Sequence, residues 1–126
     1  MITKQDCYIV STYQSGTIEL ANLNAHDATR RLLEALHIPH KEVWGVYQGN
    51  KEQSFVIVGK QYQTIVEKLA KQYNQECYLH IHNDNFSELV YTDRKTAIGY
   101  FTNVSATEAR GHASYTEDNG QFYVTK

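Results

Sequence analysis

The strongest constraint on the fold is that two expected strands are apolar on both faces. Residues 7–13 and 52–59 are rich in β-branched and aromatic residues, which favours extended strands. Ile9 stands next to Val10, and residues 55–58 are apolar without a break. Because successive side chains of a strand point to opposite faces, a sheet that contains these strands needs a cover on each face.

Two helical stripes supply one of these covers. After Asn24, which we expect to cap the first helix, apolar residues recur at spacings of three and four until Pro39 ends the pattern. Residues 62–73 repeat this periodicity, with charged residues between the apolar ones, and predict a second helix. The two helices separate four strand-like segments, so the expected order of elements begins as strand, helix, strand, strand, helix, strand.

The remaining strand signals complete a prediction of the fold class. Residues 41–48 and 52–59 are joined by a short Gly-Asn-Lys link of hairpin type, and residues 75–82 alternate as a half-buried strand does. This βαββαβ order predicts a ferredoxin-like α+β sandwich, an antiparallel sheet with two helices on one face. Weaker candidates at 97–102, 113–116 and 121–125 would form a C-terminal strand extension.

The second face of that sheet is left without a helix. We expect self-association to cover it, since a large exposed apolar face is costly in water. The alternative is that the last 30 residues fold back over the open face.

Composition limits the class of protein. A chain of 126 residues with 41% hydrophobic content is sized for one domain, so we expect residues 1–126 to form a single unit. The net charge of -2 and the scattered Lys and Arg residues argue against nucleic acid as a partner. Two cysteines in apolar runs fit a reducing compartment, and no export signal or membrane-length apolar run is present, which predicts a cytoplasmic protein without membrane contact.

No phosphate-binding loop, nucleophile elbow or Cys-x-x-Cys motif is present, so candidate chemistry rests on groups of residues. His80 and His82 share a strand face with Glu76, and three such side chains could bind zinc. The ordinary interpretation is a solvated strand face.

A second group lies in the hairpin and at the start of the fourth strand. Tyr47 and Glu52 bring a phenol and a carboxylate together at a strand end, although Glu52 could equally be an ordinary exposed charge. Gln75 lies two residues before Cys77, so both side chains point to the same face of the strand. The amide of Gln75 is therefore expected on the apolar side, where it needs hydrogen-bond partners. Gln75 is therefore either a residue that satisfies a turn or a ligand donor, and the adjacent Glu76 has the same ambiguity as Glu52.

These residues belong to a longer ordered pattern. It comprises residues 9–15 (Ile-Val-Ser-Thr-Tyr-Gln-Ser), 30–36, 47–54, 75–79 (Gln-Glu-Cys-Tyr-Leu), 88–91 (Glu-Leu-Val-Tyr), 99–104 and 120–124. In order and spacing, nearly the whole chain resembles the bacteriophage S-adenosylmethionine lyases, formerly called hydrolases. Each stretch is short, so the resemblance rests on their succession.

The resemblance implies an activity and an assembly. Members of the family split S-adenosylmethionine into methylthioadenosine and homoserine lactone without a metal or other cofactor, and they form trimers with sites between subunits. Carried over by position, the active-site tyrosine falls on Tyr47, the acidic residue on Glu52 and the glutamine on Gln75. The link between Tyr47 and Glu52 is shorter here than in those relatives. The match of the family's tyrosine to Tyr47 is therefore less direct than the match of its acidic residue to Glu52.

The chemistry suits these residue types. The substrate carries a sulfonium, an ammonium and a carboxylate, and its own carboxylate can close the lactone, so no protein nucleophile is needed. Glu52 would hold the cationic part, with Tyr47 and Gln75 beside it. Tyr13 and Ser15, at the end of a central strand, and Glu76 are the expected substrate contacts.

Two other classes of function stay open at the level of sequence. One is a phage-type module that binds a small nucleotide or inhibits a host protein without catalysis. The other is an interaction domain whose open sheet face forms a homo-oligomer. If the lyase prediction holds, loss of the methyl donor would blunt methylation-dependent restriction in the host cell.

Overall fold

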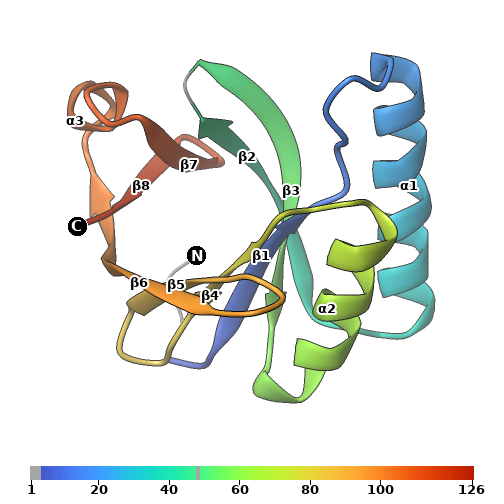
Figure 1. The fold of residues 1–126 in the computed structure, drawn as a ribbon. Coiled ribbons are helices and arrows are strands. Elements are labelled where there is room, and N and C mark those ends of the chain that lie inside the picture. The colour runs from blue at the N-terminus through green and yellow to red at the C-terminus, as the bar shows by residue number, and fades with distance from the viewer. Residues whose placement is uncertain (1–3, 48) are drawn as a thin grey trace.

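A computed structural model describes residues 4–47 and 49–126 of the chain. Within these residues, eight antiparallel strands form one closed barrel in the order β1-β3-β2-β7-β8-β6-β5-β4 (Figure 1). The elements are β1 (Cys7–Ser11), α1 (Glu19–Ala35), β2 (His40–Tyr47), β3 (Asn50–Val58), the 3-10 turn η1 (Lys60–Tyr62), α2 (Gln63–Gln72), β4 (Tyr78–Ile81), β5 (Phe86–Val90), β6 (Lys95–Val104), α3 (Ala106–Arg110), β7 (Ser114–Asp118) and β8 (Gln121–Thr125).

One apolar core lies outside the barrel, beneath the helices. Side chains of alternate residues in β1 and β3, such as Tyr8 and Phe55, are fully buried against Leu33 of α1 and Val66 of α2. Figure 1 shows α1 and α2 on the same side of the barrel, with α3, β7 and β8 on the other. The two helices therefore cover one face of the central strands. The apolar stripe predicted for α2 is buried, as Val66, Leu69 and Ala70 show. The stripe predicted for α1 is wrong, because Leu32 and Leu36 are exposed and the helix instead buries Asn22, His26, Thr29 and Leu33.

A second core fills part of the barrel interior. The other alternate residues, Cys7 of β1 and Val56 of β3, pack there with Ile81 of β4, Phe101 of β6 and Tyr123 of β8. The rings of Phe101 and Tyr123 stack with their centroids 5.1 Å apart. Both faces of β1 and β3 are thus covered by one chain, which accounts for their continuous apolar runs.

The predicted ferredoxin-like sandwich is wrong, because the sheet has no open face. The C-terminal segment does not merely extend one edge: β7 pairs with β2, and β6 pairs with β5, so the sheet closes on itself. An ion pair of 2.8 Å between Lys41 Nζ and the buried Asp118 Oδ2 joins β2 to β7 as well. The alternative interpretation, in which the last 30 residues fold back over an open face, also differs from the structure, because β6, β7 and β8 are strands of the same closed sheet. The apolar strands therefore no longer call for a partner subunit.

The first helix begins earlier than its sequence pattern suggests. We predicted a start at Asn24, but α1 begins at Glu19, after the extended residue Ile18. The buried Asn22 anchors this extra turn, since its side chain accepts a hydrogen bond from Gln14 N at 2.9 Å and donates one to Gln14 O at 3.3 Å. Among the residues that the structure describes, no helix combines the length and apolar character needed to cross a membrane.

Candidate active site

The barrel contains a cavity of about 580 Å³ that is open to solvent. Residues from β2 to β8 and from the loop after β1 line it. Buried Phe101, Thr116 and Tyr123 form deep parts of the wall, and exposed Ser15, Tyr47 and Glu76 border it at the surface. This volume lies within the range of ordinary small-molecule sites.

Glu52 points into this cavity because of its position in β3. It shares the strand face of Ser54 and Val56, and Val56 belongs to the barrel interior. Its cross-strand neighbour on β2 is Gly45, where an added Cβ would lie 3.6 Å from Ser54 Oγ and 3.8 Å from the carbonyl oxygen of Glu52. The glycine therefore leaves space beside the carboxylate.

Burial also changes the acidity of Glu52. The side chain is half-buried, and loss of water contact raises the pKa of its carboxyl group above the ordinary value. A cationic ligand beside Glu52 would oppose this effect and favour the ionised form. The position thus suits an acidic side chain that binds a cation.

Tyr47 lies on the same inward-facing side of the hairpin, at its outer end. It pairs with Asn50 across the hairpin and is 61% exposed. Tyr47 therefore occupies the rim of the cavity, closer to solvent than Glu52. Two more predicted contacts, Ser15 and Glu76, also line the cavity.

The charge of the cavity wall has one sign. Glu52 and Glu76 line it, and no Lys, Arg or His side chain does so within residues 4–47 and 49–126. Unopposed carboxylates at a partly dry surface attract cations more strongly than they would in bulk water. The cavity therefore favours a ligand with net positive charge.

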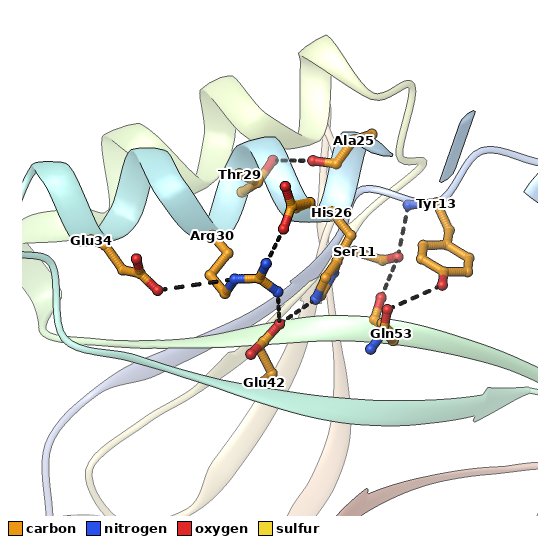
Figure 2. A network of polar contacts seen from close by, with 10 residues as sticks. Ser11, Tyr13, Ala25, His26, Thr29, Arg30, Glu34, Glu42 and Gln53 are labelled. Atoms are coloured by element: carbon orange, nitrogen blue, oxygen red, sulfur yellow. Dashed lines mark hydrogen bonds and ion pairs between the residues drawn. The ribbon is translucent and has the colours of Figure 1, made fainter. Parts of the chain in front are cut away.

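Gln75 and Tyr13 lie beside the cavity rather than in its wall. Gln75 Nε2 donates to the carbonyl oxygen of Tyr13 and, at 3.1 Å, to that of Tyr73. The Tyr13 hydroxyl donates to Gln53 Oε1 at 3.3 Å (Figure 2). Burial, then the charges of Glu19 and Glu52, raise the pKa of Tyr13. Gln75 thus holds the loop that presents Ser15, which agrees with the turn-satisfying interpretation of its amide.

The comparison with known families decides which class of protein this is. The model of the S-adenosylmethionine lyase family matches residues 8–126, from β1 to the end of the chain. The chain belongs to the S-adenosylmethionine lyase family. It is therefore an enzyme, a lyase that acts on S-adenosylmethionine. No curated protein matches the chain.

Part of the cavity wall of this lyase was missed by the analysis of its sequence. Ser114, Tyr115 and Thr116 of β7 and Tyr123 of β8 line the cavity. The alternation of apolar and polar residues in the terminal strands shows which of these side chains share a face. It does not show that this face lines the cavity until the barrel is known to close. Rings in the wall can stack on a nucleobase or face a cation.

Another polar group of the lyase lies outside the barrel, between α1 and β2 (Figure 2). The buried His26 stacks on Phe55 at 4.2 Å, and its Nε2 is 2.7 Å from Glu42 Oε1. Arg30 donates to the same carboxylate oxygen at 3.3 Å and also pairs with Asp27. This network attaches α1 to the barrel and is separate from the cavity.

The three residues considered for zinc do not come together. The rings of His80 and His82 stack with centroids 3.9 Å apart, but Glu76 lines the cavity instead. His80 is 5% exposed, so the solvated interpretation of this face does not hold for it. Its neighbour is Asp6, which lies 2.9 Å away.

Proposed function

We propose that this lyase, with residues 1–126 as one domain, converts S-adenosylmethionine to 5′-methylthioadenosine and L-homoserine lactone. The observation that carries the proposal is the cavity, which contains two carboxylates and, within the described residues, no basic side chain in its wall. S-adenosylmethionine carries a sulfonium, an ammonium and one carboxylate, so it is a net cation. Its charge complements that of the wall.

The proposed reaction is an intramolecular displacement. A carboxylate oxygen of the substrate attacks the methylene carbon bonded to sulfur, and the C–O bond of a five-membered lactone forms. The C–S bond breaks, and its electron pair stays on sulfur, which turns the sulfonium into the neutral thioether of methylthioadenosine. The step needs no proton transfer and no nucleophile from the protein.

The enzyme's contribution in this reaction is positioning and a drier environment. Effective molarities for well-oriented intramolecular reactions reach on the order of 10⁵ M or more, so bending the chain into attack geometry is worth several kcal/mol. The reacting carboxylate and sulfonium neutralise each other as the bond forms. A pocket that excludes water therefore hinders the separated charges more than the transition state.

We assign roles to the residues from where they lie. Glu52, half-buried in the wall, holds the ammonium or sulfonium of the bent chain, and Tyr47 closes the rim over it. Glu76, just before β4, and Ser15, in the loop after β1, contact the substrate at the surface of the cavity. Gln75 acts through Tyr13, whose carbonyl accepts its hydrogen bond, and so positions the loop that carries Ser15.

We further propose a homotrimer in which neighbouring subunits complete the sites. The support from this chain is a group of exposed apolar residues at the start of α1, close in sequence to Ser15: Ile18 is 71% exposed, Leu20 63% and Leu23 42%. Such a group favours burial against another surface. Sedimentation should give three chains per particle, and Leu20→Glu should lower that number.

The consequence in a cell would be depletion of the methyl donor. If the gene is carried by a bacteriophage, the enzyme would act in the host cytoplasm and counter restriction that depends on methylation. Expression should lower the S-adenosylmethionine content of the cell and the methylation of its DNA, both measurable by mass spectrometry.

The decisive experiment combines product analysis with a matched pair of variants. Wild-type enzyme and S-adenosylmethionine should yield methylthioadenosine and homoserine lactone by mass spectrometry. A charge pair about 4 Å apart in a partly dry site is worth up to about 4 kcal/mol, so Glu52→Gln should lower kcat/KM by roughly 10²- to 10³-fold. Glu117→Gln is the control, since Glu117 follows the cavity residue Thr116 on β7 and faces the other way.

The acidity of Glu52 adds a further readout. Because its pKa is raised, kcat/KM of the wild type should fall as acid protonates this carboxylate, and this limb should vanish in Glu52→Gln. Methionine or homoserine as the primary product would contradict the lactone mechanism. Retention of S-adenosylmethionine without any product would favour a binding module instead.

A further inference from the structure

A cluster of three potential ligands lies outside the lyase cavity. Asp6, just before β1, and His80 and His82, in and after β4, each offer a ligand atom, and these atoms lie within 4.8 Å of one another. Asp6 Oδ2 is 2.9 Å from His80 Nε2 and 3.9 Å from His82 Nδ1. Residues distant in the sequence thus converge around one carboxylate oxygen.

The cluster lies on the opposite face of the sheet from the cavity. Leu79 of β4 lines the cavity, and the next residue, His80, points outward, where its ring packs 4.7 Å from that of Tyr8. Leu89 of β5 also lines the cavity, whereas Glu88 faces His80 across the ladder. A function of this cluster is therefore independent of the lyase reaction.

We propose that Asp6, His80 and His82 form a binding site for a divalent transition-metal ion of the zinc class. Zinc binds nitrogen and oxygen donors at about 2.0–2.2 Å in a tetrahedron, which places neighbouring donor atoms about 3.4 Å apart. The two distances from Asp6 Oδ2, 2.9 Å and 3.9 Å, lie on either side of that value. The rings of His80 and His82 stack with an interplanar angle of 24°, so coordination would require them to rotate until Nε2 and Nδ1 converge on the ion.

The protonation of His82 fits a ligand. Its Nε2 is 2.6 Å from Glu88 Oε1, and because a carboxylate accepts hydrogen bonds, Nε2 carries the proton. The other nitrogen, Nδ1, then presents its lone pair, and this is the atom that faces Asp6. Histidines that bind metals typically donate their second N–H to a carboxylate in this way.

His80 supplies a second, independent observation. The residue is 5% exposed, and its Nδ1 is buried without a hydrogen-bond partner within the described residues. A carboxylate accepts hydrogen bonds, so the 2.9 Å contact with Asp6 Oδ2 places the proton of His80 on Nε2 and leaves Nδ1 with a lone pair that is unpartnered in the described part of the chain. Coordination of a cation by Nε2 would move this proton to Nδ1 and replace the hydrogen bond with two bonds to the ion.

The donor set selects among cations. Two imidazoles and one carboxylate suit zinc, cobalt or nickel, whereas magnesium and calcium prefer oxygen ligands. The carboxylates of Asp6 and Glu88 balance the charge of a divalent ion. His82, with a side chain 34% exposed, leaves a path for the ion and room for water at a fourth position.

Bound metal would connect the entry of β1 to β4, and through Glu88 to β5. An ion that binds only the folded chain stabilises it by mass action. At a free zinc concentration 100-fold above Kd, the Tm should rise by about 5–10 °C.

The test uses the full chain, freed of metal by a chelator and then dialysed. Isothermal titration with Zn²⁺ should give one ion per chain, and Co²⁺ should give the visible absorption of a tetrahedral site. His82→Ala should abolish both signals, and Glu88→Gln, which disturbs only the orienting residue, should weaken binding by roughly 10- to 100-fold. His112→Ala is the control, because His112 has the same 34% side-chain exposure and also lies beside a carboxylate, Glu108.

Absence of zinc binding in the wild type, or equal binding in His82→Ala and His112→Ala, would overturn the proposal. Circular dichroism spectra of the metal-free variants should match that of the wild type, and Glu88→Gln provides the comparison if His82→Ala does not fold. Turnover of S-adenosylmethionine should be the same with and without chelator at low temperature. The outcome for the metal site therefore does not decide the outcome for the lyase mechanism.

Discussion

Closure of the barrel by β6 can be tested with two adjacent aromatic residues. Phe101 is 3% exposed and stacks on Tyr123 inside the barrel, whereas Tyr100 is 52% exposed and contacts Phe86 edge-on at 5.6 Å. Loss of a buried phenyl ring costs about 3–5 kcal/mol. Because one side of the Phe101 ring borders the cavity, we expect Phe101→Ala to cost about 3 kcal/mol. Tyr100→Ala should cost about 1 kcal/mol or less.

The two variants should differ clearly in one assay. Urea unfolding followed by circular dichroism and by the fluorescence of Trp44 gives the free energy of unfolding, which for a domain is about 5–15 kcal/mol in total. For a chain of this length we expect Phe101→Ala to lower the Tm by about 10 °C. Equal, small effects of both substitutions would refute the closed barrel, because they would mean that neither ring is buried.

Three further predictions concern the cavity, the polar network on α1 and the thiols. Gly45→Val places a branched side chain beside Glu52 and should raise KM for S-adenosylmethionine at least about 10-fold with an unchanged circular dichroism spectrum; an unaltered KM would contradict the assigned pocket. Burial lowers the pKa of His26 in spite of its hydrogen bond to Glu42, so the folded state resists protonation of this ring. The resulting stability is present above the ordinary pKa of histidine, near 6.5, and is lost as pH falls through the lower folded value. The free energy of unfolding should therefore decline between about pH 7 and pH 5, and His26→Gln should flatten this slope; an equally steep slope in the variant would exclude His26 as its source. Burial raises the pKa of Cys7 to about 11 and also that of Cys77, but only Cys7 is fully buried. Iodoacetamide at pH 8 should thus modify Cys77 first and Cys7 only after addition of urea, as peptide mass spectrometry can establish; prior labelling of Cys7 would contradict its burial.

The candidate site was predictable where neighbouring residues define it. Strand alternation from Val56 places Glu52 on the inward face, and the hairpin pairs Tyr47 with Asn50, so the carboxylate and the phenol share one surface. The role of Gln75 was open because an amide near a turn can serve either the backbone or a ligand. Only the position of the Tyr13 carbonyl distinguishes the two.

The clusters that join distant segments were not predictable in this way. His80 and His82 were identified as a pair, but Glu76 was taken as their companion because it is close in sequence. Asp6 fills that place because β1 lies antiparallel to β4, with Tyr8 opposite His80. The pairing of those strands, rather than residue spacing, selects the carboxylate.

By itself, the sequence determined the approximate strands, the existence of the two long helices, the buried face of α2 and the family, because periodicity and motif order are local properties of the chain. It did not determine the face of α1 that packs on the barrel, which is mainly polar. Only the tertiary structure decided that β2 meets β7, that the open sheet becomes a barrel and that its interior forms an anionic cavity. Pairing between distant strands depends on chain closure and on the fit of whole side-chain surfaces. Residues 95–125 have the same local pattern whether they extend a sheet or close it.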